Sequence, residues 1–421
     1  MKKLIILLCF GASVVVSAQN INGRFSSSVY SFERYDSLNS SETYLRAYEM
    51  LNLNLNYANV SIRSFLNLEG DLSNKMDYDP RLRFYNLYLE ARKIFDVATV
   101  KLGRQPLINS IAGGLFDGAS LSLANTNYKL SAYYGGNVPA YQKLELIDNW
   151  NDNYLVGGKF TTTALKNFQF SVGYINKNFK PQSYEATRLT ADLNPITVEI
   201  ENKSNQYEFV SGEINYTSEG LVKAFTRYDY DINFKQTSKF EFDARTEAVE
   251  DLGIDVYFNY RQPKIRYNSI FAVFDYGNTY EVEVGADYKL SSAFTVIGKF
   301  GNVQYKEDNA QRVSLGLATQ WGTLNYRKSL GYAGELDAIS LYSGYTMLDG
   351  LLTPSVGVSY TKYKLSPDAE SNNLTTLLAG VNIRPLRMLS FDLQAQYMDN
   401  KIYKNDFRFF FKLNHWFNFN L

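Results

Sequence analysis

Cysteine, histidine and long apolar runs are scarce in this sequence. Its 421 residues include one cysteine, one histidine and 9 prolines. The single histidine, His415, offers no nucleophile–base pair, and neither metal-ligand spacing nor a phosphate-binding loop is present, so we expect no enzymatic activity, no metal and no cofactor. No stretch after residue 19 approaches 18 continuous apolar residues, which excludes membrane-spanning helices. Lysine plus arginine equals aspartate plus glutamate at 43 each, so no basic excess favours nucleic acid.

The first 18 residues predict a secretory signal peptide. Two lysines precede the apolar run Leu4–Val16, and Val16-Ser17-Ala18 fits a small-x-small cleavage site. Cys9 lies inside the apolar run, so we interpret it as part of the signal and not as a lipid anchor. Residues 19–421 would then form an exported chain without cysteine, which must be stable without disulfides.

The clearest local pattern is the alternation of apolar and polar residues in Leu51–Glu69, which resumes after the turn Ala58-Asn59. A period of two is the strand period, because successive side chains point to opposite faces. The segment therefore predicts a β-hairpin with one apolar and one polar face. The next hairpin repeats the pattern, with Tyr85 and Leu87 on the apolar face and Glu90 on the polar face.

The same pattern recurs to the end of the chain. Ten hairpins plus one strand at each end give a best count of 22 strands, and any even number from 16 to 22 fits the alternation. The predicted strands are 20–34, 44–57, 60–69, 83–91, 97–102, 119–123, 128–134, 154–160, 168–174, 210–216, 222–230, 239–245, 254–260, 282–290, 293–300, 313–318, 324–330, 338–347, 352–360, 377–383, 389–397 and 407–421. The longest irregular segments are predicted at 176–205 and 261–279, the second with a further strand candidate at 270–274.

A soluble β-sandwich and a membrane-spanning β-barrel both show such alternation, but this chain has too many long strands for one sandwich. Its 34 tyrosines and 28 phenylalanines favour strands. Tyrosines gather near predicted strand ends, as at Tyr57 and Tyr134, which is typical of aromatic girdles at a bilayer interface. In lipid every backbone group must be paired within the protein, and a closed barrel is the only sheet that achieves this. We therefore predict a single closed antiparallel transmembrane β-barrel over residues 19–421.

The chain from residue 19 resembles Gram-negative outer-membrane β-barrels of the porin type. Its last strand alternates aromatic residues, including Phe417 and Phe419, which in that family the insertion machinery recognises, although Leu421 stands where Phe or Trp is usual. Gly103-Arg104-Gln105 looks like a segment of several substrate-selective porins. The resemblance implies a barrel in outer-membrane lipid, and we expect both termini on the periplasmic rim. We expect no plug domain, because strand pattern begins close to Gln19, which argues against a TonB-dependent transporter.

The leading functional hypothesis is a channel for passive or weakly selective diffusion of small hydrophilic solutes. The residues predicted to line its lumen are Arg63, Glu90, Arg92, Lys101, Lys129, Glu213, Arg227, Glu241, Asp243, Arg245, Glu283 and Asp287. Rings or opposed walls of charge in a lumen set the preference of a channel for ions and solutes. The alternative for these charged residues is that they only pair with each other and keep the wall of the lumen hydrated. The alternative is a barrel without a channel, acting as an anchor or as a subunit of a surface-protein or secretion assembly. The sequence leaves open a homo-oligomer or a surface-protein partner.

Segment Gly103–Gly114 is the best candidate for a loop that folds into the lumen. A barrel of this size without a plug leaves a wide opening. Apolar residues of the segment, such as Ile108, would be held in water by an outward loop. We therefore predict that Arg104, Gln105 and Ile108 narrow the lumen, with an ordinary rim loop as the alternative.

Overall fold

The computed structural model describes residues 19–37, 40–73, 80–107, 113–139, 144–179, 183–201, 207–218, 220–264, 277–332, 334–366, 368–401 and 405–420. The predicted signal peptide, Ile108, the strand candidate 270–274 and Leu421 lie outside these ranges. Within them, no helix is long and apolar enough to cross a membrane.

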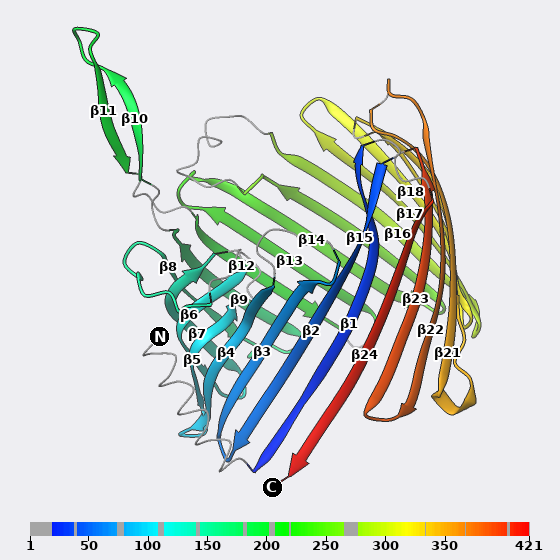
Figure 1. Cartoon of the computed structure of the whole chain (residues 1–421), viewed down its shortest axis with the longest axis horizontal. Coiled ribbons are helices and arrows are strands. Elements are labelled where there is room, and N and C mark those ends of the chain that lie inside the picture. The colour runs from blue at the N-terminus through cyan, green and yellow to red at the C-terminus, as the bar shows by residue number, and fades with distance from the viewer. Residues whose placement is uncertain are drawn as a thin grey trace.

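Twenty-two strands form one antiparallel sheet that closes into a barrel (Figure 1). Neighbours in sequence pair with each other, β12 pairs with β9, and β24 pairs with β1 from Asn20 to Ser31. The barrel strands are β1 (Asn20–Ser37), β2 (Ser40–Tyr57), β3 (Val60–Asp71), β4 (Arg81–Ile94), β5 (Ala98–Leu107), β6 (Gly114–Ala124), β7 (Tyr128–Val138), β8 (Tyr154–Thr162), β9 (Phe168–Lys177), β12 (Tyr207–Thr217), β13 (Val222–Asp231), β14 (Gln236–Val249), β15 (Leu252–Arg261), β16 (Thr279–Ser291), β17 (Phe294–Tyr305), β18 (Asp308–Thr319), β19 (Gly322–Gly331), β20 (Glu335–Gly344), β21 (Leu352–Lys364), β22 (Asn372–Leu386), β23 (Leu389–Asn400) and β24 (Asp406–Asn420). A 3-10 turn, η2 (Leu348–Gly350), precedes β21.

The predicted count of 22 strands is confirmed, and each predicted strand overlaps one strand of the barrel. The opening hairpin has the expected register, with Tyr57 opposite Val60 and Leu51 opposite Leu66. The prediction is wrong for 176–205, which is not wholly irregular. It contains β10 (Ser183–Leu189) and β11 (Pro195–Glu201), which pair only with each other. These strands have seven residues each, too few for a clear alternation.

The two ends of the barrel differ in their connections. The end that carries the chain termini, where Asn20 pairs with Asn420, has mostly short turns such as 58–59 and 292–293, and we call it the turn rim. The opposite end, the loop rim, carries longer connections such as 139–153 and 262–278. The β10–β11 hairpin projects away from the barrel at the loop rim (Figure 1).

The two faces of the sheet are chemically different. Large apolar side chains are exposed on one face of nearly every strand, for example Leu130, Val172, Val284 and Phe409. Charged residues alternate with them and make ion pairs that skip a strand, such as Arg245 of β14 with a residue of β16. Side chains two strands apart approach each other on the concave side of a curved sheet, so the charged face is the interior. The apolar outer belt is far larger than the apolar patches that soluble proteins expose.

A β-bulge between β3 and β4 changes which residues of β4 point inward. Phe65 lies opposite Asn86, but the next residue of β3 lies opposite Phe84, so Tyr85 is the extra residue. The Tyr85 ring stacks on Phe65 at 5.1 Å between centroids, on the inner face. The prediction that Tyr85 belongs to the apolar outer face is therefore wrong, because the bulge breaks the period of two.

One part of the interior is apolar. Leu107, Phe116, Leu155, Ile175 and Phe209 form a buried cluster on the inner face of β5, β6, β8, β9 and β12, near the loop rim. These strands are not all neighbours, so their side chains meet across the concave side of the sheet. The ammonium group of Lys264, which follows β15, lies 5.3 Å from the Phe209 ring, and burial lowers the pKa of this group.

Candidate functional site

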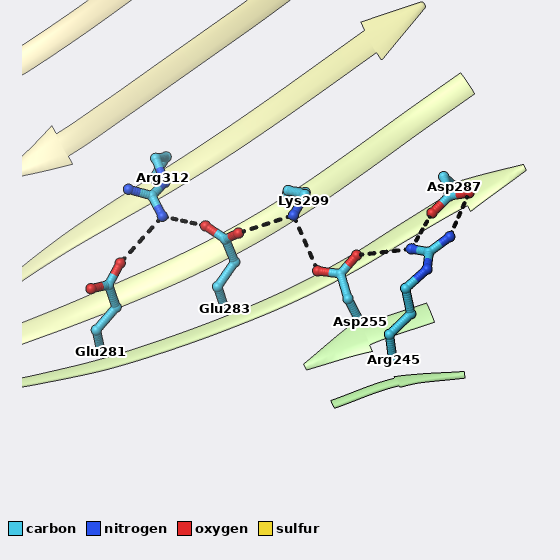
Figure 2. A network of polar contacts seen from close by, with 7 residues as sticks. All are labelled: Arg245, Asp255, Glu281, Glu283, Asp287, Lys299 and Arg312. Carbon is cyan, nitrogen blue, oxygen red and sulfur yellow. Dashed lines mark hydrogen bonds and ion pairs between the residues drawn. The ribbon is translucent and has the colours of Figure 1, made fainter. Parts of the chain in front are cut away.

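Seven charged side chains form a continuous network on the inner face of β14–β18 (Figure 2). Its members are Arg245, Asp255, Glu281, Glu283, Asp287, Lys299 and Arg312. Arg245 donates to both carboxylate oxygens of Asp287 at 2.6 and 3.1 Å. Lys299 Nζ lies 3.2 Å from Asp255 Oδ2 and 3.4 Å from Glu283 Oε1. Arg312 contacts Glu283 and lies 3.3 Å from Glu281 Oε1, so positive and negative groups alternate across five strands.

This network is in contact with water. The side chains of Arg245, Lys299 and Arg312 are 33, 38 and 32 % exposed, although they point into the barrel. Three cations there face four carboxylates, so the network is close to neutral. A wall of paired but hydrated charges is suited to a polar interior and would be unstable against lipid.

A second network, which we call the basic strip, lies on the inner face of β3–β5. It consists of the cations Arg63, Arg81, Arg83, Arg92 and Lys101 and the carboxylates Glu69 and Glu90. Glu90 is shared by three cations: Arg63 Nε at 3.4 Å, Lys101 Nζ at 3.7 Å and Arg92 Nε at 3.9 Å. Glu69 is shared by Arg81 at 3.4 Å and Arg83 at 3.2 Å. Five cations thus surround two carboxylates.

The two networks lie on opposite walls of the barrel. In the closed sheet of 22 strands, β3 and β16 are separated by eleven strand-to-strand steps in either direction. The basic strip is centred near β3–β4, and the neutral network is centred near β16. The interior therefore has a positive wall that faces a nearly neutral one.

All twelve residues predicted to line the lumen lie on the inner face, and the structure brings some of them together. Arg63, Glu90, Arg92 and Lys101 meet in the basic strip, and Arg245, Glu283 and Asp287 meet in the nearly neutral network on β14–β18. The remaining predicted lumen residues are dispersed. Glu213 binds Lys159 at 2.5 Å, Arg227 binds Asp229 at 2.5 Å and Glu241 binds Lys239 at 2.6 Å. Lys129 and Asp243 are exposed, and neither makes an ion pair with another described residue. Whether these residues govern solute passage stays a prediction.

Four members of the nearly neutral network were not predicted from the sequence: Asp255, Glu281, Lys299 and Arg312. Each lies on the polar face of a predicted strand or beside its first residue. Alternation alone would have found these four residues, because each falls an even number of residues from an inward-facing residue of its own strand.

The structure differs from the prediction for the Gly103–Gly114 loop. Residues Gly103–Leu107 continue β5 and pair with β6, so the connection begins only at residue 108. Gln105 faces inward, where Ser120 Oγ donates to its side chain. Arg104 follows outward-facing Leu102 by two residues and points away from the lumen, so the prediction that it narrows the lumen is wrong.

Arg104 instead forms a buried ion pair on the outer side of the barrel. Its Nε and Nη2 each lie 2.8 Å from a carboxylate oxygen of Asp117, and the two side chains are 2 and 3 % exposed. Segment 144–153 covers the pair: Arg104 donates to the Glu145 carbonyl, and the Ile147 backbone N–H donates to Asp117, both at 2.8 Å. The segment also places Trp150 edge-on against Tyr134 of the outer face, at 5.5 Å.

The closed barrel, its apolar outer belt and its charged interior define the class of integral-membrane β-barrels of the outer-membrane type. Among the described residues, no group of three or more His, Cys, Asp or Glu side chains is arranged to hold a metal ion.

Comparisons with protein-family models and with curated protein sequences find no match. Several solved β-barrels give structural matches at low sequence identity, and one of them reaches a TM-score above 0.5. The cryo-EM structure of the E. coli P pilus tip assembly intermediate PapC-PapD-PapK-PapG matches over 94 % of this chain and 61 % of that chain, at 9 % identity and a TM-score of 0.52. The PapC translocation pore matches at 10 % identity and a TM-score of 0.49, over 94 and 99 % of the two chains. OccAB4 of Acinetobacter baumannii matches at 12 % identity and a TM-score of 0.44, over 96 and 99 % of the two chains.

Proposed function

We propose that the chain is an outer-membrane channel for the diffusion of small hydrophilic solutes, with both termini at the periplasmic rim. One observation carries the proposal: ion-paired cations in the barrel interior remain about one-third exposed, so water reaches both charged walls. A sheet of 22 strands encloses more space than its own side chains fill. Among the residues that the structure describes, no nucleophile–base pair supports a catalytic role, and the balance of 43 basic and 43 acidic residues in the sequence does not favour nucleic-acid binding.

Single-channel recording tests this function. The full chain, folded into planar lipid bilayers, should produce discrete conductance steps in potassium chloride. Folding is checked beforehand by heat-modifiable migration on gels, which distinguishes a closed barrel from unfolded protein. Correctly folded protein that inserts and gives no conductance steps would refute the channel.

The β10–β11 hairpin favours a second function, a subunit or anchor of a surface-protein assembly. Its two strands pair only with each other, and Ile196 and Val198 on one face are exposed. A two-stranded hairpin is marginally stable alone in water. A protein partner that covers the apolar face would stabilise it. Pull-down with the intact chain and with a chain lacking residues 183–201 tests this function, which requires a partner that only the intact chain retains.

A further inference from the structure

The basic strip has more positive charge than its own carboxylates neutralise. Five cations share Glu69 and Glu90, which leaves an excess of three positive charges on the inner face of β3–β5. Asp71, also on β3, does not offset this excess, because Arg46 of β2 binds it at 2.7 Å. The two strip carboxylates are largely buried, whereas Arg81, Arg92 and Lys101 are 36–39 % exposed. The cations therefore form the surface that a solute in the lumen meets.

Several polar atoms of the strip also lack partners. Arg83 Nε and Arg92 Nε are buried donors with no hydrogen-bond acceptor among the described residues. Buried polar groups are nearly always hydrogen-bonded, so these donors are open to an acceptor that enters from the lumen, either water or an oxygen atom of a solute. Asn67 Oδ1 of β3 and Asn86 Oδ1 of β4 also have no hydrogen-bond partner among the described residues. A side-chain amide carries a carbonyl oxygen that accepts and an NH2 group that donates. Rotation of the Asn67 and Asn86 amides can therefore present the NH2 donor in place of the oxygen.

We infer that the basic strip is a binding site for oxyanions, the carboxylate or phosphate groups of solutes that pass through the lumen. Four of its five cations are arginines, whose planar guanidinium groups match two oxygens of such a group at once. The nearly neutral wall opposite does not compete for the anion. This inference rests on the proposed function for its route of access, but the binding itself does not require conduction.

Phosphate block of the chloride current tests the site. The half-blocking phosphate concentration is measured for the full chain and for two arginine-to-glutamine variants. Arg92→Gln removes one cation of the strip, and it should raise the half-blocking concentration about tenfold, the loss of one charge-assisted hydrogen bond. Arg327→Gln is the matched control, because Arg327 is an exposed inner-face arginine of β19 outside both networks, and it should change the value less than about twofold.

A second variant and a second measurement keep the test decisive. Glu90→Gln leaves three cations uncompensated, so it should strengthen the block where Arg92→Gln weakens it. Titration calorimetry of the folded protein with inorganic phosphate and with acetate measures binding without conduction and shows which oxyanion is preferred. If the protein shows no conductance but binds an oxyanion in a way that depends on Arg92, the channel function is refuted and the oxyanion site is supported. Absence of binding to both anions, or equal effects of Arg92→Gln and Arg327→Gln, would overturn the site whatever the conductance.

Discussion

Replacing Asp117 with asparagine tests whether the Arg104–Asp117 pair fastens segment 144–153 to the barrel. Asp117 accepts three hydrogen bonds of 2.8 Å, two from Arg104 and one from the Ile147 backbone N–H. The substitution leaves the guanidinium buried without its counter-charge. Breaking a buried ion pair by removing one partner costs about 3–5 kcal/mol, and we expect a loss of that size in the free energy of unfolding.

The measurement is urea unfolding of protein folded into lipid vesicles. Arg104→Met combined with Asp117→Leu removes both charges, so it should be less destabilising than Asp117→Asn alone. Glu370→Gln is the control, because its pair with Lys401 is 87 and 64 % exposed and should contribute less than about 1 kcal/mol. A loss below about 1 kcal/mol for Asp117→Asn, or a double variant as unstable as the single one, would show that the pair is not held in a buried site.

Three further predictions concern the barrel. Val358→Arg, on the exposed outer face of β21, should cost about 2–4 kcal/mol of folding free energy in lipid. Ser359→Arg, on the inner face of the same strand, should cost far less. Equal costs for the two variants would show that our assignment of the faces is wrong. A Cβ atom on Gly23 would lie 2.1 Å from the Asn52 carbonyl oxygen, so Gly23→Ala should destabilise the barrel by about 1–3 kcal/mol in urea, and Gly212→Ala, with nothing within 4 Å, should not. Replacement of residues 183–201 by a short Gly/Ser linker should leave the unfolding midpoint and the heat-modifiable migration unchanged, because β10 and β11 pair only with each other. A lowered midpoint would mean that the hairpin stabilises the barrel.

The sequence predicted the barrel well because the alternation that identifies a strand is a local pattern within that strand. A period of two is set by the geometry of each strand, and turns interrupt it at every rim, so strand number and the nature of the two faces could be derived without any contact between distant residues. The even count of 22 strands followed from the same pattern and is confirmed. The predicted lumen residues lie on the inner face for this reason, even where their partners were not foreseen.

Local departures from the period were invisible in the sequence. The β3–β4 bulge moves Tyr85 to the inner face and also puts Arg83 there, 3.2 Å from Glu69. Strict alternation from Leu87 would have put Arg83 on the apolar outer face. A bulge inserts one residue without any fixed sequence signature, so only the pairing of the two strands revealed the full basic strip.

The sequence by itself determined the class of this protein. Apolar and polar residues alternate in each strand, so the sheet has one apolar and one charged face, and the strands are numerous enough to close the sheet into a barrel. What the tertiary structure decided is which charges meet. Arg245 reaches Asp287 across an intervening strand, and β3 faces β16 only because the sheet closes. Arg104 is buried by segment 144–153, which lies about 40 residues further along the chain. Periodicity fixes the direction of a side chain relative to its own strand, but the curvature and closure of the sheet fix its distance from side chains on other strands.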